Sequence, residues 1–531
     1  MKYKNWPKNL LIHSFFWPVV LIVIILPDLR RISYTPGDSF YPLIHKIHED
    51  YYGYLSYIKQ GRSQNYIINQ YTTADLPPSY LHNYYLFLGR LGKIFSLSDI
   101  YMYRIGLYFP LLLYCLYSYC LVSFLIPSKY KWPALFIIFF ASPFPDKMVT
   151  ILGRDFNFKA EWWTGLDAYS RLTMKPHHFM STSLMLASTF YFLKYLKGRN
   201  LRDLIYTGFL MLPAMIFFAM PAFILFCALS AVLGFYLVTR KPKIRESLVI
   251  IIIFLSSIAS LIFVNWEAKK INLVTWESVR LNSPQDSLLK LTYRFFLPLG
   301  ILPVFFIPAV FYIREKRKPK YIFPMLIVAI AYLLFILSAK GIVPLPMIRL
   351  VYYAPYVFGG LLATMGLIYV TEKINSTAWK RAALSGITIL LITNAFFGLQ
   401  SYWWPELFKK EIFINTYIPK PYLQAMDYLK LNTKQYSNVM STFYTGMFIP
   451  AFTYNKVYIG HEAVPADFPT VWWTAENFMS GQFSQDEARR ILSENRILYV
   501  FWDQGNLPPA YAELMQPLYK HEYVTIYKTT L

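Results

Sequence analysis

The sequence predicts an α-helical polytopic membrane protein with a small α/β domain at its C-terminal end, and three observations lead to this prediction. Of the 531 residues, 56% are hydrophobic and only 15% are charged, whereas soluble domains carry about 25% charged residues. The apolar residues gather in runs long enough to cross a bilayer. Beyond residue 400 these runs stop, and candidate strands alternate with candidate helices.

The apolar runs define the candidate membrane spans. A transmembrane helix needs about 20 predominantly apolar residues. Eleven runs approach that length, at 10–27, 102–126, 132–145, 178–195, 203–220, 222–239, 247–264, 294–313, 321–338, 350–370 and 382–400. The third run is short, and the fifth and sixth are joined only by a predicted kink around Met220 and Pro221. Either feature is typical of a broken or re-entrant helix that neighbouring helices support.

The basic residues predict the orientation of the chain. Lys and Arg number 52 against 29 acidic residues, which gives a net charge of +23. These bases gather in short segments between the runs, at 2–8, 128–131, 196–202, 239–246, 314–320 and 371–381. With eleven spans, all these segments fall on one side, which the positive-inside rule makes the cytoplasm. We therefore expect a cytoplasmic N-terminus, an uncleaved signal anchor, an extracytoplasmic C-terminal domain and no nucleic-acid partner.

Two long outer loops follow from this topology, at about 29–101 and 146–177. Within 78–98, the residues that recur at helical spacing are Leu81, Tyr84, Tyr85, Leu88, Leu91 and Phe95. We expect this helix to lie along the membrane surface or on the bundle. The aromatic content of 19% agrees with such a layer, because Tyr and Trp rings favour the headgroup zone of a membrane.

The segment 401–531 differs from the bundle, residues 1–400, in its composition. Helical patterns occur at 421–430 and 484–495, and the second begins with Ser484 and Glu487 at the spacing of a capping box. Strand patterns occur at 438–444, 456–460, 497–503 and 523–528, and 447–453 resembles the start of a helix. This alternation predicts a small α/β domain.

A pair of adjacent acids, Glu49 and Asp50, opens the stretch HEDYYGYLSYIKQG just after the first span. Single charges at the end of a bundle are most often solvated loop residues. This pair differs because it precedes a strongly patterned helix and is flanked by His45 and His48. Adjacent carboxylates repel, so one can act as a general base, or both can hold a divalent cation such as Mg²⁺ or Mn²⁺.

Basic side chains at two other places are candidates for binding a phosphate. Lys175, His177 and His178 stand where the fourth span begins, and imidazoles there can donate to phosphate oxygens. Arg349 follows a Pro-rich kink in the loop 338–353, and its guanidinium suits a bidentate grip on a phosphate. The alternative is structural, since the histidines can be packing residues and Arg349 can extend along the membrane surface.

The remaining candidates are single residues. Asp146 and Asp155 in the second outer loop are spread apart instead of forming a pair, and His461 in the tail precedes Glu462. A lone His in a strand and turn is more often structural. The sequence contains no HExxH, GxSxG, P-loop or dinucleotide-binding motif in a suitable setting. We therefore expect neither a nucleotide nor a haem cofactor.

Taken together, these features resemble the GT-C superfamily of integral-membrane glycosyltransferases, over nearly the whole chain. The stretch 48–61 resembles the acidic Asp-x-x-x-Tyr-Leu stretch of that superfamily's first outer loop, with Asp50, Tyr54 and Leu55 at its positions. The stretch 175–188 resembles a Pro-His entry into a later span. The segment 439–464 is similar to one in uncharacterised bacterial members. More distantly, the chain resembles protein O-mannosyltransferases and aminoarabinose transferases.

The resemblance implies an inverting sugar transfer on the outer face of the membrane. The donor would be a polyprenyl-phosphate sugar, and the acceptor a glycan, a lipid or a protein. Asp50 would be the base or a metal ligand, with Glu49 in support. The groups that would stabilise the departing phosphate are Lys175, His177, His178 and Arg349. The second outer loop departs from the family pattern because it lacks a clean acidic pair, which leaves metal dependence open.

Other classes of protein remain alternatives. A transporter or flippase for lipid-linked or anionic substrates favours ionisable groups near the bilayer midplane and internal repeats. Here the charges concentrate at the outer rim, and the two halves show no repeat. A polymerase or ligase acting on lipid-linked glycans shares the donor. A non-catalytic membrane scaffold that displays the tail domain would not need the acids, and Asp50→Asn would then be silent.

Overall fold

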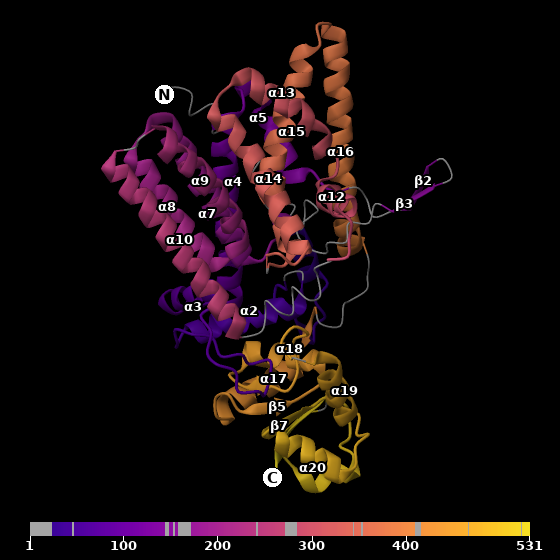
Figure 1. The fold of residues 1–531 in the computed structure, drawn as a ribbon. Coiled ribbons are helices and arrows are strands. Elements are labelled where there is room, and N and C mark those ends of the chain that lie inside the picture. Colours follow the sequence, from indigo (N-terminus) through magenta and orange to yellow (C-terminus); the bar gives the residue numbers. More distant parts are fainter. Residues whose placement is uncertain are drawn as a thin grey trace. The chain divides into compact units, whose positions relative to one another are not determined.

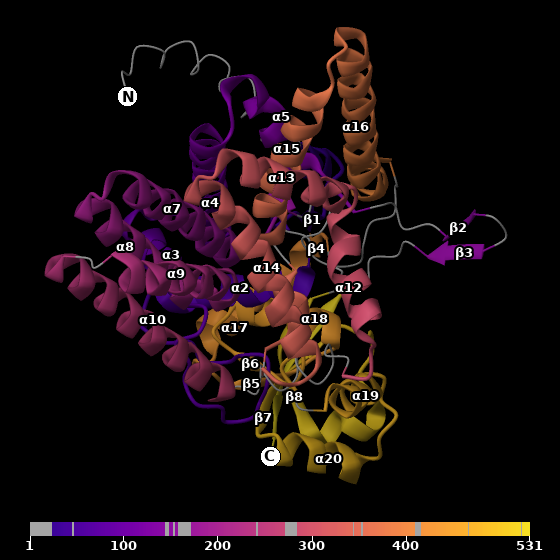
Figure 2. The same cartoon turned by 45° about the horizontal axis from the view of Figure 1, so that its top comes forward.

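The structure is a computed structural model that forms two compact units. It describes residues 24–44, 47–143, 148–151, 154–157, 171–240, 243–270, 284–343, 345–351, 354–408, 416–465, 467–521 and 523–530. One unit, here called the helical unit, comprises Met1–Pro27 and Leu107–Lys409. The other, here called the mixed unit, comprises Asp28–Gly106 and Lys410–Leu531. Figures 1 and 2 label their elements.

Long apolar helices build the helical unit (Figure 1). They are α4 (Asp99–Leu125, which starts in the mixed unit), α5 (Lys131–Phe140), α7 (Pro176–Gly198), α8 (Leu201–Phe217), α9 (Ala219–Arg240), α10 (Ile244–Lys270), α12 (Leu288–Phe296), α13 (Phe306–Lys316), α14 (Pro319–Ala339), α15 (Ala354–Lys373) and α16 (Thr377–Phe408). β2 (Met148–Ile151) and β3 (Arg154–Asn157) pair antiparallel to each other. The closest packing pairs α7 with α8 and α15 with α13 and α14, around a core of buried aliphatic and aromatic residues.

Several of these helices are able to cross a membrane. Among the described residues, four are long and apolar enough, namely Asp99–Leu125, Ala219–Tyr236, Ile244–Lys270 and Pro319–Ala339. The pair Leu288–Leu299 and Leu302–Lys316 adds a fifth if it is one bent span. The part of the chain that the structure describes is thus mostly helical and includes four or five candidate spans. The count of eleven stays a prediction, and most of the first run, 10–27, lies outside the described residues.

The structure departs from the predicted span 294–313, which is bent by 97° between Leu299 and Leu302. Gly300 stands there at φ +59°, in the left-handed region that other residues rarely adopt. Pro298 and Pro303 flank it and cannot donate backbone hydrogen bonds. The expected break between the fifth and sixth runs is present, because α8 ends at Phe217 and α9 begins at Ala219. The third run forms a helix of 10 residues.

The mixed unit combines helices from both ends of the chain with a five-stranded sheet (Figure 2). The sheet has the order β6 (Lys456–Val457), β5 (Asn438–Met440), β7 (Ile497–Trp502), β9 (Val524–Thr529) and β8 (Met515–His521). The helices are α2 (His48–Gly61), α3 (Asn83–Ile94), α17 (Lys420–Asn432), α18 (Phe443–Phe452), α19 (Phe468–Met479) and α20 (Gln485–Glu494). β5 runs parallel to β6 and β7, whereas β9 runs antiparallel to β7 and β8.

Most of the predicted elements of the C-terminal segment are confirmed. α17 covers 421–430, α20 covers most of 484–495, and a strand overlaps each of the four predicted strand ranges. The range 438–444 is only partly correct, because β5 ends at Met440 and α18 begins at Phe443. The capping box of Ser484 and Glu487 is complete. α19 and β8 were not among the predicted elements. The predicted boundary at residue 400 stays a prediction, and α16 continues to Phe408.

The first outer loop is the segment that the structure places least expectedly. Residues 28–106 belong to the same compact unit as 410–531, and β1 (Ser39–Phe40) pairs with β4 (Ile418–Pro419). The predicted amphipathic helix exists as α3, and it packs on α2 within the mixed unit. Gly89 permits this contact, because a Cβ there would lie 2.0 Å from the Ile58 carbonyl oxygen.

Candidate active site

The chain just before α2 is held by a buried ion pair. The Arg104 guanidinium contacts both carboxylate oxygens of Asp28, at 2.8 and 3.0 Å. The Tyr41 hydroxyl donates to the same carboxylate at 2.8 Å. Arg104 also donates to the carbonyls of Leu43 and Ile44. Because a planar guanidinium grips a carboxylate in a fixed geometry, this pair fixes the segment that leads into α2.

The helix α2 presents the acid pair in its first turn. Its apolar face is formed by Tyr51, Tyr52, Leu55 and Ile58, all at most 1% exposed, at the spacing of one helix face. Glu49 and Asp50 therefore stand at the helix N-terminus, where the helix dipole favours negative charge. Their side chains are 24% and 21% exposed. They are thus sheltered from bulk water but accessible to a substrate.

His461 faces both acids from the C-terminal segment of the mixed unit. Its Nδ1 lies 3.8 Å from the Glu49 Oε2, and its Nε2 lies 4.0 Å from the Asp50 Oδ1. The backbone N–H of Glu462 donates to the Glu49 Oε2 at 2.9 Å. The Tyr54 hydroxyl donates to the Asp50 Oδ1 at 3.2 Å. The structure therefore brings together three sequence-predicted candidates that come from opposite ends of the chain.

The orientation of the His461 ring follows from its neighbours. The Ala463 backbone N–H donates to Nδ1 at 3.1 Å, so Nδ1 is an acceptor and the neutral ring carries its proton on Nε2. That proton lies on the side of Asp50. The Tyr71 ring meets His461 edge-on at 5.9 Å, and its hydroxyl donates to the Met447 carbonyl at 3.0 Å. The ring is thereby held between the backbone and Tyr71.

The electrostatics of Glu49 differ from those of a surface carboxylate. Burial raises the pKa of Glu49 above its ordinary value of 4.5, and the adjacent Asp50 charge acts in the same direction. The His461 charge and the Glu462 N–H oppose this rise of the pKa only in part. A carboxylate pair in which one member holds its proton more tightly is typical of acid–base sites.

The raised pKa of Glu49 predicts a pH-dependent stability. Between pH 4.5 and the raised value, the folded state binds more protons than the unfolded state, so stability falls as the pH rises through this window. Glu49→Gln cannot ionise, and we expect its thermal midpoint to rise relative to wild type across the window and then stay constant. Thermal unfolding in detergent over a pH series measures this. The control is Glu513→Gln, at an exposed glutamate. If the midpoints of Glu49→Gln and wild type differed by the same amount at every pH, the raised pKa of Glu49 would be contradicted.

The predicted phosphate-binding residues lie in the helical unit. His177 and His178 are 2% and 4% exposed, and Pro176 between Lys175 and His177 starts α7. The His178 ring stacks on the Phe218 ring, with 3.8 Å between the ring centroids. The Arg349 guanidinium lies 5.9 Å from the centroid of the Phe218 ring. The structure therefore gathers His177, His178 and Arg349 around the extended residue that separates α8 from α9. Lys175 is their neighbour in the chain.

The other acidic candidates are less well defined. Asp146 lies outside the described residues, as does His45 beside the acid pair. Asp155 lies in β3, opposite Thr150 of β2. The roles of both aspartates stay predictions.

A metal site was the other interpretation of the acid pair, and metal dependence stays a prediction. The described residues include no group of three or more His, Cys, Asp and Glu side chains that could hold an ion. Glu49 and Asp50 instead meet hydrogen-bond donors, from the Glu462 N–H and the Tyr54 hydroxyl. This arrangement fits a base and its supports.

Tyr54 was expected only as a member of the acidic stretch, without a role in the site, and Tyr71 was not expected at all. Tyr54 follows Asp50 by four residues in α2, and the i,i+4 spacing places both side chains on one helix face. That spacing is a signal available in the sequence. Tyr71 has no such signal, because its contact with His461 depends on how the loop after α2 meets the C-terminal segment.

Comparisons with known proteins identify the fold. No family model and no curated protein matches the sequence. Among solved structures, the chain is similar to the oligosaccharyltransferase AglB from Archaeoglobus fulgidus, with TM-score 0.53, 13% identity and coverage of 97% of this chain and 74% of that one. It is similar to ArnT from Cupriavidus metallidurans, with TM-score 0.52, 12% identity and 97% of both chains covered.

The arabinofuranosyltransferase AftD from Mycobacteria is a third similar structure, with TM-score 0.52, 13% identity and coverage of 97% of this chain and 40% of that one. All three are GT-C glycosyltransferases. The chain therefore has the GT-C fold, and the fold expected from the resemblance is confirmed. The AglB structure is in complex with an inhibitory peptide and a dolichol-phosphate, and the ArnT structure is bound to undecaprenyl phosphate.

Proposed function

We propose that the protein is a membrane glycosyltransferase that moves a sugar from a polyprenyl-phosphate donor to a glycan, lipid or protein acceptor. One observation carries the proposal: in a chain with the GT-C fold, Asp50 and Glu49 are held together with His461 at a partly accessible helix N-terminus. The polyprenyl phosphates bound to two of the similar structures support this class of donor.

In the proposed reaction, Asp50 is the general base. Its carboxylate accepts the proton of the acceptor hydroxyl while the hydroxyl oxygen bonds to the anomeric carbon of the donor sugar. The bond between that carbon and the phosphate oxygen breaks, and its electron pair leaves with the polyprenyl phosphate. A single displacement of this kind inverts the anomeric configuration. Tyr54 orients Asp50 through its hydrogen bond, so the base is positioned before the acceptor arrives.

The departing phosphate needs positive charge or hydrogen-bond donors close to it. We assign this role to Lys175, His177, His178 and Arg349. The gathering of His177, His178 and Arg349 beside Phe218 supports the assignment, because fixed donors and charges stabilise a developing anion most strongly in a site sheltered from water.

The topology proposed for this reaction places the chemistry outside the cytoplasm. Eleven spans in the cytoplasmic membrane, a cytoplasmic N-terminus and an extracytoplasmic segment 401–531 follow from the distribution of Lys and Arg. Glu49, Asp50 and His461 then share the outer face with the C-terminal segment.

The experiment is sugar transfer by purified protein in liposomes, with a panel of radiolabelled polyprenyl-phosphate sugars and separate glycan, lipid and peptide acceptors. We expect labelled acceptor and an equal amount of released polyprenyl phosphate from one donor class. Movement of intact lipid-linked sugar across the bilayer, without cleavage of its sugar–phosphate bond, would favour a flippase instead. Release of label into water alone would contradict transfer to an acceptor.

His461 is proposed as a positioning residue that acts through the acids. His461→Ala removes the imidazole, whose Nδ1 faces Glu49 and whose Nε2 faces Asp50. Misplacing a catalytic group by about 1 Å can cost about 100-fold in rate, so we expect kcat to fall about 10- to 100-fold with KM for the donor little changed. The acid limb of the pH–rate profile should also move. A fall in thermal stability with an unchanged pH–rate profile would indicate a structural role only.

A further inference from the structure

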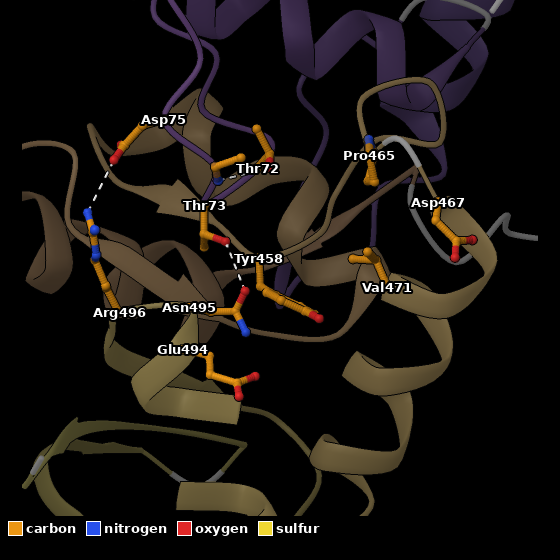
Figure 3. A pocket seen from close by; sticks show the side chains of 11 residues that line it. Thr72, Thr73, Asp75, Tyr458, Pro465, Asp467, Val471, Glu494, Asn495 and Arg496 are labelled. Atoms are coloured by element: carbon orange, nitrogen blue, oxygen red, sulfur yellow. Dashed lines mark hydrogen bonds and ion pairs between the residues drawn. The ribbon is translucent and has the colours of Figure 1, made fainter. Parts of the chain in front are cut away.

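A polar cleft of about 440 Å³ opens in the mixed unit, and its walls include none of the acid-site residues (Figure 3). One wall is the loop from Thr72 to Asp75, and the other comes from the segments around β6, α19 and α20. The loop is fastened by a 2.8 Å hydrogen bond from the Val457 N–H to the Gln70 carbonyl. The volume lies within the range of about 300–1,000 Å³ that small-molecule sites occupy.

The charges in this polar cleft disfavour anions. Three carboxylates line it, from Asp75, Asp467 and Glu494. Asp75 lies 3.2 Å from Arg496 and 3.4 Å from Lys456, so two cations already face it. Within the described residues, Asp467 and Glu494 form no ion pair. A phosphate or a carboxylated ligand would therefore meet net repulsion there.

Glu494 is placed where it does not help its own helix. It is the last residue of α20, and a carboxylate near a helix C-terminus interacts unfavourably with the helix dipole. Its exposed side chain borders the cleft beside Tyr458 and Asn495 (Figure 3). Carboxylates are strong acceptors for ligand hydroxyls, because the hydrogen bond is charge-assisted.

The cleft also has an apolar side. The half-buried Tyr458 and Val471 line it together with Pro465 (Figure 3). Hydroxyl acceptors on one wall and a ring with aliphatic groups on another match a sugar, which offers hydroxyls at its rim and C–H groups on its faces. The hydroxyls of Thr72 and Thr73 add further donors and acceptors.

Two chain segments connect the cleft to the acid site. Tyr458 precedes His461 by three residues, and Thr72 directly follows Tyr71, whose ring contacts His461. A span of three residues covers at most about 11 Å. Resting on the proposed function, we propose that the polar cleft binds a neutral sugar unit of a saccharide acceptor, at some distance from the hydroxyl that Asp50 deprotonates.

Equilibrium binding of labelled neutral oligosaccharides to the full-length protein in detergent tests this proposal. The library contains glucans, mannans, galactans and arabinans from disaccharide to hexasaccharide, with anionic and amino-sugar oligosaccharides for comparison. We expect a neutral member to bind, and Glu494→Ala to weaken its Kd about 10- to 100-fold. Val471→Trp, which fills the cleft, should abolish binding. Asp486→Asn, another exposed carboxylate of α20, is the matched control and should bind as wild type.

Asp50→Asn separates this proposal from the proposed function. The variant should bind the oligosaccharide with the wild-type Kd, even though its kcat for sugar transfer is strongly lowered. Binding in the cleft without transfer from any donor would leave the saccharide site standing and remove the transferase function. Failure of every neutral saccharide to bind would overturn the site. The site would also be overturned if Val471→Trp left binding intact, or if Asp50→Asn abolished binding.

Discussion

Asp50→Asn lowers kcat for sugar transfer by about 10²–10⁴-fold, the range that a positioned general base contributes. The amide keeps the shape of the side chain and accepts the Tyr54 hydrogen bond, but it cannot take the proton of the acceptor hydroxyl. The KM for the polyprenyl-phosphate donor should change little, since the donor phosphate does not depend on the base. Initial rates in proteoliposomes at matched protein folding measure both constants.

The control for this prediction is Asp38→Asn, an exposed aspartate of the same unit that lies outside the acid site. It should transfer sugar at the wild-type rate. Wild-type transfer by Asp50→Asn would remove Asp50 as the base. A parallel loss of donor binding would instead assign Asp50 to holding the substrate.

Arg104→Met lowers the free energy of unfolding by about 3–5 kcal/mol, because it leaves a buried carboxylate without its charged partner. The Asp28 side chain is 12% exposed and the Arg104 side chain 8%, so water cannot replace the guanidinium. The segment before α2 also loses the donors to the Leu43 and Ile44 carbonyls. Thermal unfolding in detergent should show a large drop in the midpoint, accompanied by loss of transfer.

The double variant Asp28→Leu/Arg104→Met distinguishes loss of the pair from exposure of one charge. Replacing a buried ion pair by apolar residues is often close to neutral, so the double variant should be more stable than Arg104→Met alone. A double variant as unstable as the sum of the two single variants would contradict this account of the ion pair.

Only part of this site could be predicted from the sequence. The helix α2 with Glu49 and Asp50 in its first turn could be predicted, because its apolar residues recur at helical spacing and the acids are adjacent. Tyr54 could have been added from its i,i+4 spacing to Asp50. That His461 faces these acids could not be predicted, because contacts between the two ends of a chain depend on tertiary packing that no local pattern records.

In the fold too, local patterns predicted the elements but not their tertiary contacts. Apolar length located the helices of the helical unit, and turn and capping signals located most elements of the C-terminal segment, such as the capping box at Ser484. The sharp bend at Gly300 was missed because the apolar run continues through it. The grouping of 28–106 with 410–531 was missed because amphipathic α3 shows that it has a buried face, but not which partner covers it.

The central claim is that Asp50 and His461 act as one acid–base unit in sugar transfer. The measurement that tests it most directly is a double-mutant cycle on kcat/KM, with wild type, Asp50→Asn, His461→Ala and the double variant. If His461 acts through Asp50, the double variant will transfer sugar no more slowly than Asp50→Asn alone. Losses that add up in full would contradict the claim, because the two residues would then contribute independently.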